Sequence, residues 1–241
     1  MPDSDLPKLI AVIGPTASGK TALGVFLAQT FNGEIVSADA KQVYRGMDVG
    51  TAKEKNLPVP QHLIDVRDPG EKITVGDYQS LAYQAIDQVL EQGKLPVLVG
   101  GSGLYAESIT AGYLFGGPGT KESEPRYRVL KLGIAIEREE LKRRAAQRLR
   151  DRSQAIVQEV RGLLDAGVDP IWLESCGIEY RYFGRYAQGE ISLDEAIRLA
   201  TTAIFQFIKR QYTWWRRHGD VLWVDGQSEA ERAVRDFLAA G

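Results

Sequence analysis

Cysteine and histidine are scarce in this chain of 241 residues, which contains one cysteine, Cys176, and two histidines. A single cysteine cannot form an internal disulfide bond, so we expect a protein that works in the reducing cytoplasm. No Cys/His cluster in the sequence has the spacing of a zinc site. The first residues also lack the basic and apolar regions of a signal peptide. The sequence therefore predicts neither a secreted, disulfide-bonded protein nor a zinc protein.

Long apolar runs and an excess of charge of one sign are also missing. The longest apolar runs, such as residues 95–99, are far too short to span a bilayer, so no membrane partner is expected. The 30 basic and 32 acidic side chains leave a net charge of −2, which argues against a protein coated in positive charge. Basic residues are nevertheless concentrated at 138–152 and 209–217, a pattern typical of a face that binds a polyanion.

One motif in the sequence has a direct chemical meaning. Residues 14–21 read GPTASGKT and match G-x-x-x-x-G-K-[ST] in full. The glycines let the backbone curl so that N–H groups point at phosphate oxygens, and Lys20 adds a positive charge. The Thr21 hydroxyl can hold Mg²⁺. By itself the motif predicts the binding of a di- or triphosphate such as ATP, through Gly14, Pro15, Thr16, Ala17, Ser18, Gly19, Lys20 and Thr21.

Apolar segments and amphipathic segments alternate along the chain. Strands are predicted at 9–13, 34–38, 95–99, 127–136 and 221–224, and helices at 21–31, 74–91, from about 104, 138–166 and 193–217. This order predicts an α/β fold with a P-loop NTPase-like parallel sheet, helices on both faces and additional C-terminal helices. We interpret residues 1–241 as a single P-loop catalytic domain. The Gly- and Pro-rich segment 112–125 is predicted to be a short flexible linker.

Two polar positions follow predicted strands and are candidates for chemistry. Asp39 directly follows the strand predicted at 34–38. Ligands bind beyond the carboxyl ends of such strands, so Asp39 is a candidate general base. An aspartate that caps its loop is an equally good interpretation. Ser102 lies in GGSG after the strand at 95–99, where glycines let a second loop approach the same crevice. Taken alone, GGSG would be a simple tight turn.

Basic and aromatic residues alternate in KRQYTWWRR, residues 209–217. Such alternation suits phosphates and stacked bases, although an amphipathic surface helix would be the default interpretation. On a helix, Lys209 and Thr213 share one face, and Arg210 and Trp214 share another. His62, in QHLID, is expected to be a structural hydrogen-bond partner, because a lone histidine is more often structural than catalytic.

Taken together, these motifs resemble one family. GPTASGKT, SADxxQVYRGMDVGTAK, QHLIDVRDP, GGSGLY and KRQxTWWR occur in this order, and the combination is similar to tRNA dimethylallyltransferases, also called tRNA isopentenyltransferases. The resemblance extends from Leu9 to about Trp223. It implies transfer of a dimethylallyl group from dimethylallyl diphosphate to N6 of the tRNA adenosine beside the anticodon, position 37, which gives N6-isopentenyladenosine.

The resemblance also implies roles for individual residues. The loop 14–21 would cradle the diphosphate of dimethylallyl diphosphate, Asp39 would accept a proton from N6, and Ser102 would lie near the reacting centre. Lys20, Arg148 and Mg²⁺ bound to Thr21 would stabilise the departing diphosphate. The tRNA-binding residues implied by the resemblance are Asp39, Ala40, Lys41, Gln42, Ser102, Lys209, Arg210 and Gln211.

Two departures from the family pattern leave alternatives open. Ala40 replaces the serine of D-S-x-Q, and the segment 112–125 stands where the family usually carries a helical insertion that grips the anticodon stem-loop. As a member of this family, the chain is expected to be a cytoplasmic monomer whose partners are the tRNA anticodon loop and dimethylallyl diphosphate. The alternatives are prenylation of a free adenine nucleotide, a small-molecule kinase, and a tRNA-binding module without catalysis.

Overall fold

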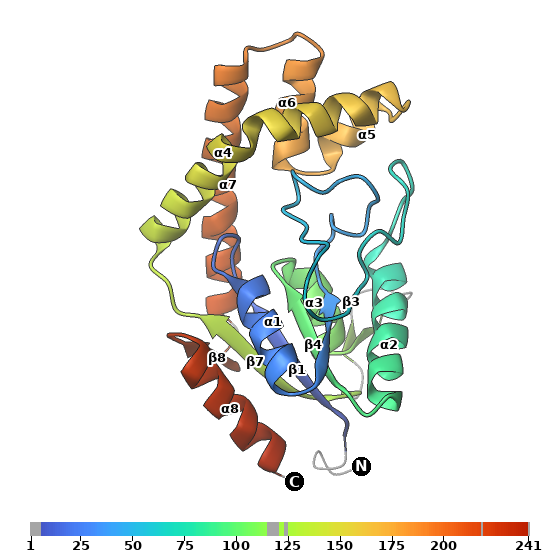
Figure 1. Cartoon of the computed structure of the whole chain (residues 1–241), viewed down its shortest axis with the longest axis vertical. Coiled ribbons are helices and arrows are strands. Elements are labelled where there is room, and N and C mark those ends of the chain that lie inside the picture. Colours follow the sequence, from blue (N-terminus) through green and yellow to red (C-terminus); the bar gives the residue numbers. More distant parts are fainter. Residues whose placement is uncertain (1–5, 115–120, 123–124, 218, 241) are drawn as a thin grey trace.

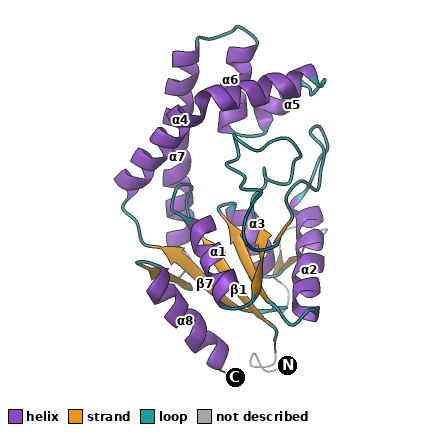
Figure 2. Ribbon diagram, viewed as in Figure 1, coloured by secondary structure: helices purple, strands orange, loops and turns teal. Residues whose placement is uncertain are grey.

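A parallel β-sheet forms the centre of the protein in the computed structural model, which describes residues 6–114, 121–122, 125–217 and 219–240 (Figures 1 and 2). All neighbouring strands of this six-stranded sheet run parallel. The predicted α/β fold with a P-loop-type parallel sheet is therefore confirmed. In spatial order the strands are β3 (Gln61–His62), β2 (Gly33–Ser37), β4 (Leu95–Gly100), β1 (Lys8–Ile13), β7 (Arg128–Ile134) and β8 (Val221–Val224).

The described helices fall into three groups around this sheet (Figure 1). One pair covers one face, a second pair covers the other face, and four helices stand beyond the carboxyl ends of the strands. None of the helices in the described ranges is long and apolar enough to cross a membrane. The first pair is α1 (Lys20–Thr30) and α8 (Gln227–Ala239), the second pair is α2 (Val75–Glu91) and α3 (Gly103–Thr110), and the four are α4 (Arg138–Asp165), α5 (Pro170–Ser175), α6 (Ile178–Ala187) and α7 (Leu193–Arg217).

Strand β1 shows why the apolar run at 9–13 is continuous. Leu9, Ala11 and Ile13 face the core formed with α2 and α3. Ile10 and Val12 face the core formed with α1 and α8. A strand that is buried on both faces needs apolar side chains at every position, so the alternation of a half-exposed strand is absent.

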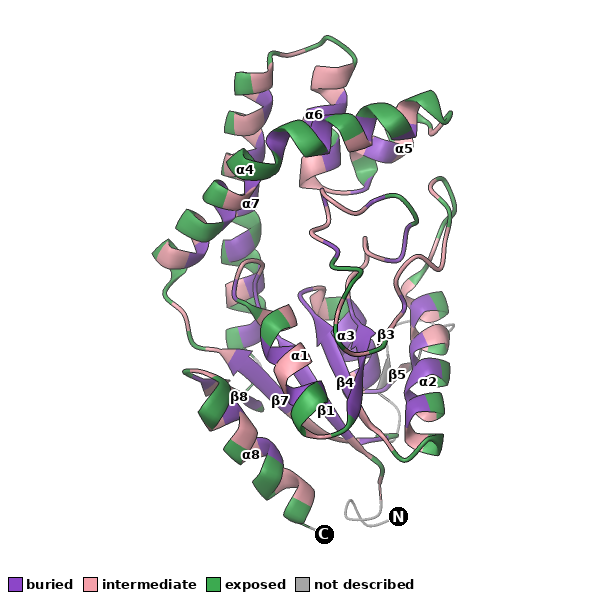
Figure 3. Ribbon diagram, viewed as in Figure 1, coloured by how far each residue is buried: buried purple, intermediate pink, exposed green. Residues whose placement is uncertain are grey.

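The helices beyond the strands have a core of their own. In Figure 3, α4, α6 and α7 turn buried sides toward one another. Leu149, Phe183 and Ile204, one from each of these helices, belong to this core. Helix α7 then continues to the sheet, where the fully buried Trp215 joins the core between the sheet and α2 and α3. Helix α7 therefore ties the helical group to the sheet.

The sequence patterns predicted most of the elements and missed several. Helices α4 and α7 and strand β8 agree with the prediction within one residue. Helices α5, α6 and α8 and strand β3 were not predicted. Helix α5 has 6 residues and begins with a local signal, because the Asp169 carboxylate accepts a hydrogen bond from the Ile171 N–H at 3.0 Å. Helix α5 and the two-residue strand β3 are too short for a hydrophobic period to be visible, whereas α6 with 10 residues and α8 with 13 are long enough and were still missed.

The predicted linker at 112–125 is partly ordered into secondary structure. Strands β5 (Tyr113–Leu114) and β6 (Lys121–Glu122) pair antiparallel with each other. At these four positions backbone pairing replaces solvent as hydrogen-bond partner, and the interpretation of 112–125 as a short linker stays a prediction. Residues 115–120 and 123–124, which also belong to the predicted linker, lie outside the described residues.

Candidate active site

A cavity of about 1050 Å³ lies between the carboxyl ends of the strands and the helices α4, α6 and α7. The loops that follow β1, β2 and β4 form one side of it, and the helices form the opposite wall. Ligands of open parallel sheets bind at this edge. The cavity thus has the place expected for the active site, and it is large enough for a small ligand together with an inserted base.

The phosphate loop, residues 14–21, lies at the base of the cavity between β1 and α1. Its backbone is left-handed at Gly14, Ala17 and Gly19, with φ angles of 136°, 64° and 91°, and therefore curls tightly. Helix α1 begins directly after Gly19. The Ser18 hydroxyl is buried and has no hydrogen-bond partner among the described residues. A curled loop, a helix N-terminus and an unpartnered hydroxyl fit a bound phosphate group.

Lys20 is the cation at the base of the cavity. Its Nζ donates a hydrogen bond to the Pro15 carbonyl oxygen at 2.6 Å. Burial lowers the pKa of Lys20 to about 8; the Asp39 carboxylate opposes this shift and the Arg148 guanidinium adds to it. An anion placed beside the ammonium group would favour its charged form, so binding of a negatively charged ligand would keep Lys20 protonated.

Two helices reach across the cavity to the phosphate loop. The Arg148 guanidinium of α4 donates to the Thr16 hydroxyl at 3.0 Å, and burial lowers the pKa of this arginine. The Gln211 side chain of α7 is 7% exposed and accepts from the Thr16 N–H at 2.9 Å. The Gln211 amide also donates to the Gly101 carbonyl at 2.9 Å. Gln211 therefore links the phosphate loop to the loop after β4.

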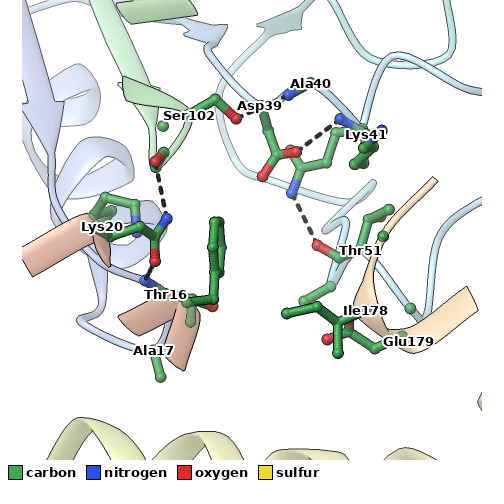
Figure 4. A pocket seen from close by; sticks show the side chains of 18 of the residues that line it. Thr16, Ala17, Lys20, Asp39, Ala40, Lys41, Thr51, Ser102, Ile178 and Glu179 are labelled. Atoms are coloured by element: carbon green, nitrogen blue, oxygen red, sulfur yellow. Dashed lines mark hydrogen bonds between the residues drawn. The ribbon is translucent and has the colours of Figure 1, made fainter. Parts of the chain in front are cut away.

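Asp39 and Ser102 lie in neighbouring loops that hydrogen-bond to each other (Figure 4). The Lys41 N–H donates to Asp39 Oδ1 at 2.9 Å, which fixes the carboxylate, and the Ala40 N–H donates to Ser102 Oγ at 3.1 Å. Both Asp39 and Ser102 line the cavity. One oxygen of Asp39 therefore caps its loop, and because the side chain also lines the cavity, its role as general base stays a prediction.

The loop after β4 approaches the loop after β2 very closely. A Cβ atom on Gly100 would lie 2.1 Å from the Ala38 carbonyl oxygen, and one on Gly101 would lie 2.8 Å from Gln211 Nε2. Only glycine fits at position 100, where the obstacle is backbone, whereas at position 101 the Gln211 side chain would have to move. The prediction that the glycines of GGSG bring a second loop to the same crevice is confirmed.

The predicted tRNA-binding residues separate into two places. Lys209 does not line the cavity; with Arg138, Lys142 and Phe205 it lines a separate groove of about 290 Å³. Lys209 points about 100° away from Arg210 and about 200° away from Gln211 around the helix axis, so it faces away from the cavity that both of these residues line. Lys209 therefore lies apart from the other predicted tRNA-binding residues, and its role in binding tRNA stays a prediction. The predicted residues that do line the cavity are Asp39, Ala40, Lys41, Gln42, Ser102, Arg210 and Gln211.

The sequence motifs missed several residues of the cavity wall. Arg152 of α4, Phe207 of α7 and Glu179 at the start of α6 all line the cavity. Burial raises the pKa of Glu179 and Arg148 lowers it, with the net direction upward. Spacing could have found the first two, because Arg152 follows Arg148 by four residues and Phe207 precedes Trp214 by seven. No local pattern marks Glu179.

His62 lies in β3 and takes no part in lining the cavity. Its Nε2 is 2.6 Å from Glu34 Oε2, and the other oxygen of Glu34 accepts from Lys94 Nζ. Although burial raises the pKa of Glu34, these hydrogen bonds lower it to a net value below normal. The predicted structural role of His62 is confirmed.

The sheet, the phosphate loop and the position of the cavity define an α/β protein of the phosphate-loop class. The IPP transferase family model matches residues 42–124 and 115–218. The chain belongs to this family. It is 36% identical to tRNA dimethylallyltransferase 1 of Geotalea daltonii, over 92% of each chain, and 37% identical to tRNA dimethylallyltransferase of Geobacter metallireducens, over 93% of this chain and 94% of the relative.

A solved structure supports the same assignment. The full-length tRNA isopentenylpyrophosphate transferase from Bacillus halodurans superposes with a TM-score of 0.86 and is 30% identical, over 96% of this chain and 95% of that chain. The alignments with the Geotalea and Geobacter relatives extend over 281 and 295 positions, although this chain has 241 residues. The relatives therefore contain residues that this chain lacks.

Proposed function

We propose that the protein transfers a dimethylallyl group from dimethylallyl diphosphate to N6 of the adenosine beside the anticodon of a tRNA, position 37. The observation that carries the proposal is one cavity that holds both a phosphate loop with Lys20 and the carboxylate of Asp39. Membership of the IPP transferase family and the names of its relatives support it.

On the donor side, the phosphate loop, Lys20 and Arg148 bind the diphosphate. The bond from C1 of the prenyl group to oxygen breaks as positive charge around the diphosphate neutralises the leaving group. The described residues offer no group of three metal-ligating side chains, so Thr21 and the diphosphate oxygens would hold Mg²⁺. Bound there, Mg²⁺ would supply further neutralisation of the leaving group.

On the acceptor side, Asp39 orients the exocyclic amine and takes its proton. N6 of adenine is a poor nucleophile, so orientation and proton removal both contribute. As N6 forms its bond to C1, the N6 proton passes to the Asp39 carboxylate and the diphosphate leaves with the electron pair of the broken bond. The Lys41 N–H occupies one oxygen of Asp39, and we assign the proton to the other.

The RNA enters the cavity along α7. Arg210, Phe207 and Trp214 line the cavity on this helix, and the Arg210 guanidinium lies 5.7 Å from the centroid of the Phe207 ring. Aromatic and guanidinium groups stack on extruded bases. The target base has to leave its stack to reach the cavity, which costs least in a single-stranded loop such as the anticodon loop.

We further propose that the segment 112–125 replaces the helical insertion of the longer relatives. The longer alignments support this idea, and so does the family model, whose two matched segments overlap at residues 115–124. Because a smaller protein has less surface for the tRNA stem, prenylation of a free adenine nucleotide remains the second candidate. If the acceptor is a free nucleotide, the basic groove that contains Lys209 would not bind tRNA and could bind another anion.

A labelled-prenyl assay separates these activities. The protein is incubated with Mg²⁺, labelled dimethylallyl diphosphate and one of three acceptors: unmodified tRNA with A37, the same tRNA with G37, or AMP. The proposal expects label only in the A37 tRNA. Label in AMP alone would establish the second candidate, and binding of tRNA without any transfer would establish a module without catalysis.

The pKa of Lys20 gives the donor site an expected pH dependence. Above about pH 8 the free protein loses the positive charge of Lys20, so the Kd for dimethylallyl diphosphate should rise up to tenfold per pH unit. Below about pH 8 Lys20 is already protonated in the free protein, so this dependence disappears there; because the bound diphosphate raises the pKa, the rise continues up to the pKa of the complex. Calorimetric titrations between pH 7 and 10 measure it. In Lys20→Arg, whose guanidinium stays charged, the rise should be absent; an equal rise in both proteins would contradict the assignment.

A further inference from the structure

The segment MDVGTAK, residues 47–53, belongs to the family-like motifs, but no role has been assigned to it. Gly50, Thr51 and Ala52 line the cavity. The Thr51 carbonyl accepts a hydrogen bond from Gln42 Nε2 at 3.3 Å, and Gln42 Oε1 accepts from Ser37 Oγ at 3.1 Å. The segment therefore supports the loop 39–42, which carries Asp39.

The backbone around this segment is strained. Ala52, Leu63 and Asp65 have φ angles of 52°, 63° and 54°, in the left-handed region that favours glycine. Such conformations persist only where the surrounding structure holds them in place. Two side chains, Lys53 and Glu159, hold this segment in place.

Lys53 is the first of two anchors. Its side chain is 0% exposed and lies 2.9 Å from Asp48 Oδ1 and 2.6 Å from Asp65 Oδ1. Its Nζ also donates to the Tyr44 carbonyl at 2.6 Å. Lys53 thus joins the segment to Tyr44, which precedes it, and to Asp65, which follows strand β3.

Glu159 of α4 is the second anchor and comes from outside the loop. Its Oε2 accepts from the N–H groups of Asp48 and Val49 at 2.7 and 2.6 Å. Its Oε1 accepts from the Gly50 N–H at 3.0 Å and from the Tyr180 hydroxyl at 2.7 Å. Hydrogen bonds to a carboxylate are about twice as strong as neutral ones, so this single side chain fixes three consecutive backbone groups.

The same helix also contacts the donor side. Arg148 donates to Thr16 of the phosphate loop, and Glu159 follows Arg148 by eleven positions. Eleven helical residues make just over three full turns, so the two side chains lie about 20° apart around the axis and about 16.5 Å apart along it. One rigid helix thus contacts the phosphate loop with one side chain and the acceptor-side loop with the other.

We propose that Glu159 is a positioning residue that fixes the acceptor side of the cavity at a set distance from the phosphate loop, an inference that rests on the proposed prenyl transfer. The reacting atoms have to be about 3–3.5 Å apart and aligned, and a misplacement of about 1 Å costs about 10²-fold in rate. Without Glu159, the segment 47–53 and Gln42 would shift with respect to the diphosphate.

The experiment compares Glu159→Ala and Glu159→Gln with a control on the same helix, Glu139→Gln. Glu139 is 76% exposed and pairs with Lys142 on its own helix. In the labelled-prenyl assay, Glu159→Ala should lower kcat about 10²-fold, with the Kd for dimethylallyl diphosphate unchanged within twofold. Glu159→Gln, which keeps one accepting oxygen, should lie between alanine and wild type, and Glu139→Gln should match wild type.

A merely structural role would give a different result. If donor affinity falls in parallel with kcat, or if folded Glu159→Gln keeps kcat within twofold of wild type, the proposal is overturned. Amide hydrogen exchange provides a measurement independent of turnover, with Asp48, Val49 and Gly50 expected to exchange faster in Glu159→Gln. If the wild-type protein transfers no prenyl group, the proposed function is wrong, and the positioning role is then tested separately by hydrogen exchange. Faster exchange with unchanged pyrophosphate binding would still support the positioning role, and unchanged exchange would refute it.

Discussion

Asp39→Asn should lower kcat for prenyl transfer by about 10²- to 10⁴-fold, the range expected for loss of a general base. The asparagine Oδ1 can still accept from the Lys41 N–H, so the loop should keep its geometry. What is lost is the ability to take the N6 proton. Single-turnover transfer to tRNA, measured with saturating donor, gives this loss directly, and the Kd for dimethylallyl diphosphate should stay within threefold of wild type.

Asp151→Asn is the matched control for this change. Asp151 is exposed on α4, where it accepts a hydrogen bond from Gln147, and it lies outside the cavity. This variant should transfer the prenyl group at the wild-type rate. A kcat for Asp39→Asn within tenfold of wild type would show that the N6 proton leaves by another route. Glu54 and Glu179, the other carboxylates that line the cavity, would then be the groups to replace next.

The sequence was sufficient to predict the sheet and the residues that follow its strands. Continuous apolar runs at β1 and β4 can only be strands buried on both faces, and the loops after such strands meet at one edge. For this reason Lys20, Asp39 and Ser102 were predicted to lie together, and they line one cavity. A helical face could also be derived, since Arg210 and Trp214 line the cavity while Lys209 lies in another groove.

The remaining contacts could not be predicted, because they join residues far apart in the sequence. The Gln211 hydrogen bonds span 195 and 110 positions, and those of Glu159 to residues 48–50 span 109 to 111. Neither side chain follows a local period or a turn pattern. Their partners depend on how the helices α4 and α7 lie across the strand ends, which is a property of the packed core in which Leu149 and Ile204 take part.

Gln211→Leu should produce the largest combined loss of stability and activity. The leucine removes the acceptor of the Thr16 N–H and the donor to the Gly101 carbonyl, both at 2.9 Å. Each buried group left without a partner costs about 1–3 kcal/mol. Thermal unfolding should therefore begin at a lower temperature, by about 2–4 °C for each kcal/mol in a protein of this size. Both loops should also relax, so kcat/KM should fall about 10²-fold for donor and acceptor alike.

Two further variants separate the contribution of the hydrogen bonds from that of the side-chain volume. Gln206→Leu makes the same change at an exposed position of α7 and should leave the melting temperature and kcat/KM near those of wild type. Gln211→Glu keeps an acceptor for the Thr16 N–H but places a negative oxygen against the Gly101 carbonyl and near the diphosphate site, so its donor affinity should fall more than its stability. If Gln211→Leu lost stability but kept both kcat/KM values, the link between the two loops would serve folding alone. The catalytic geometry would then have to be held by Ser102 and Arg148, through their bonds to Ala40 and Thr16.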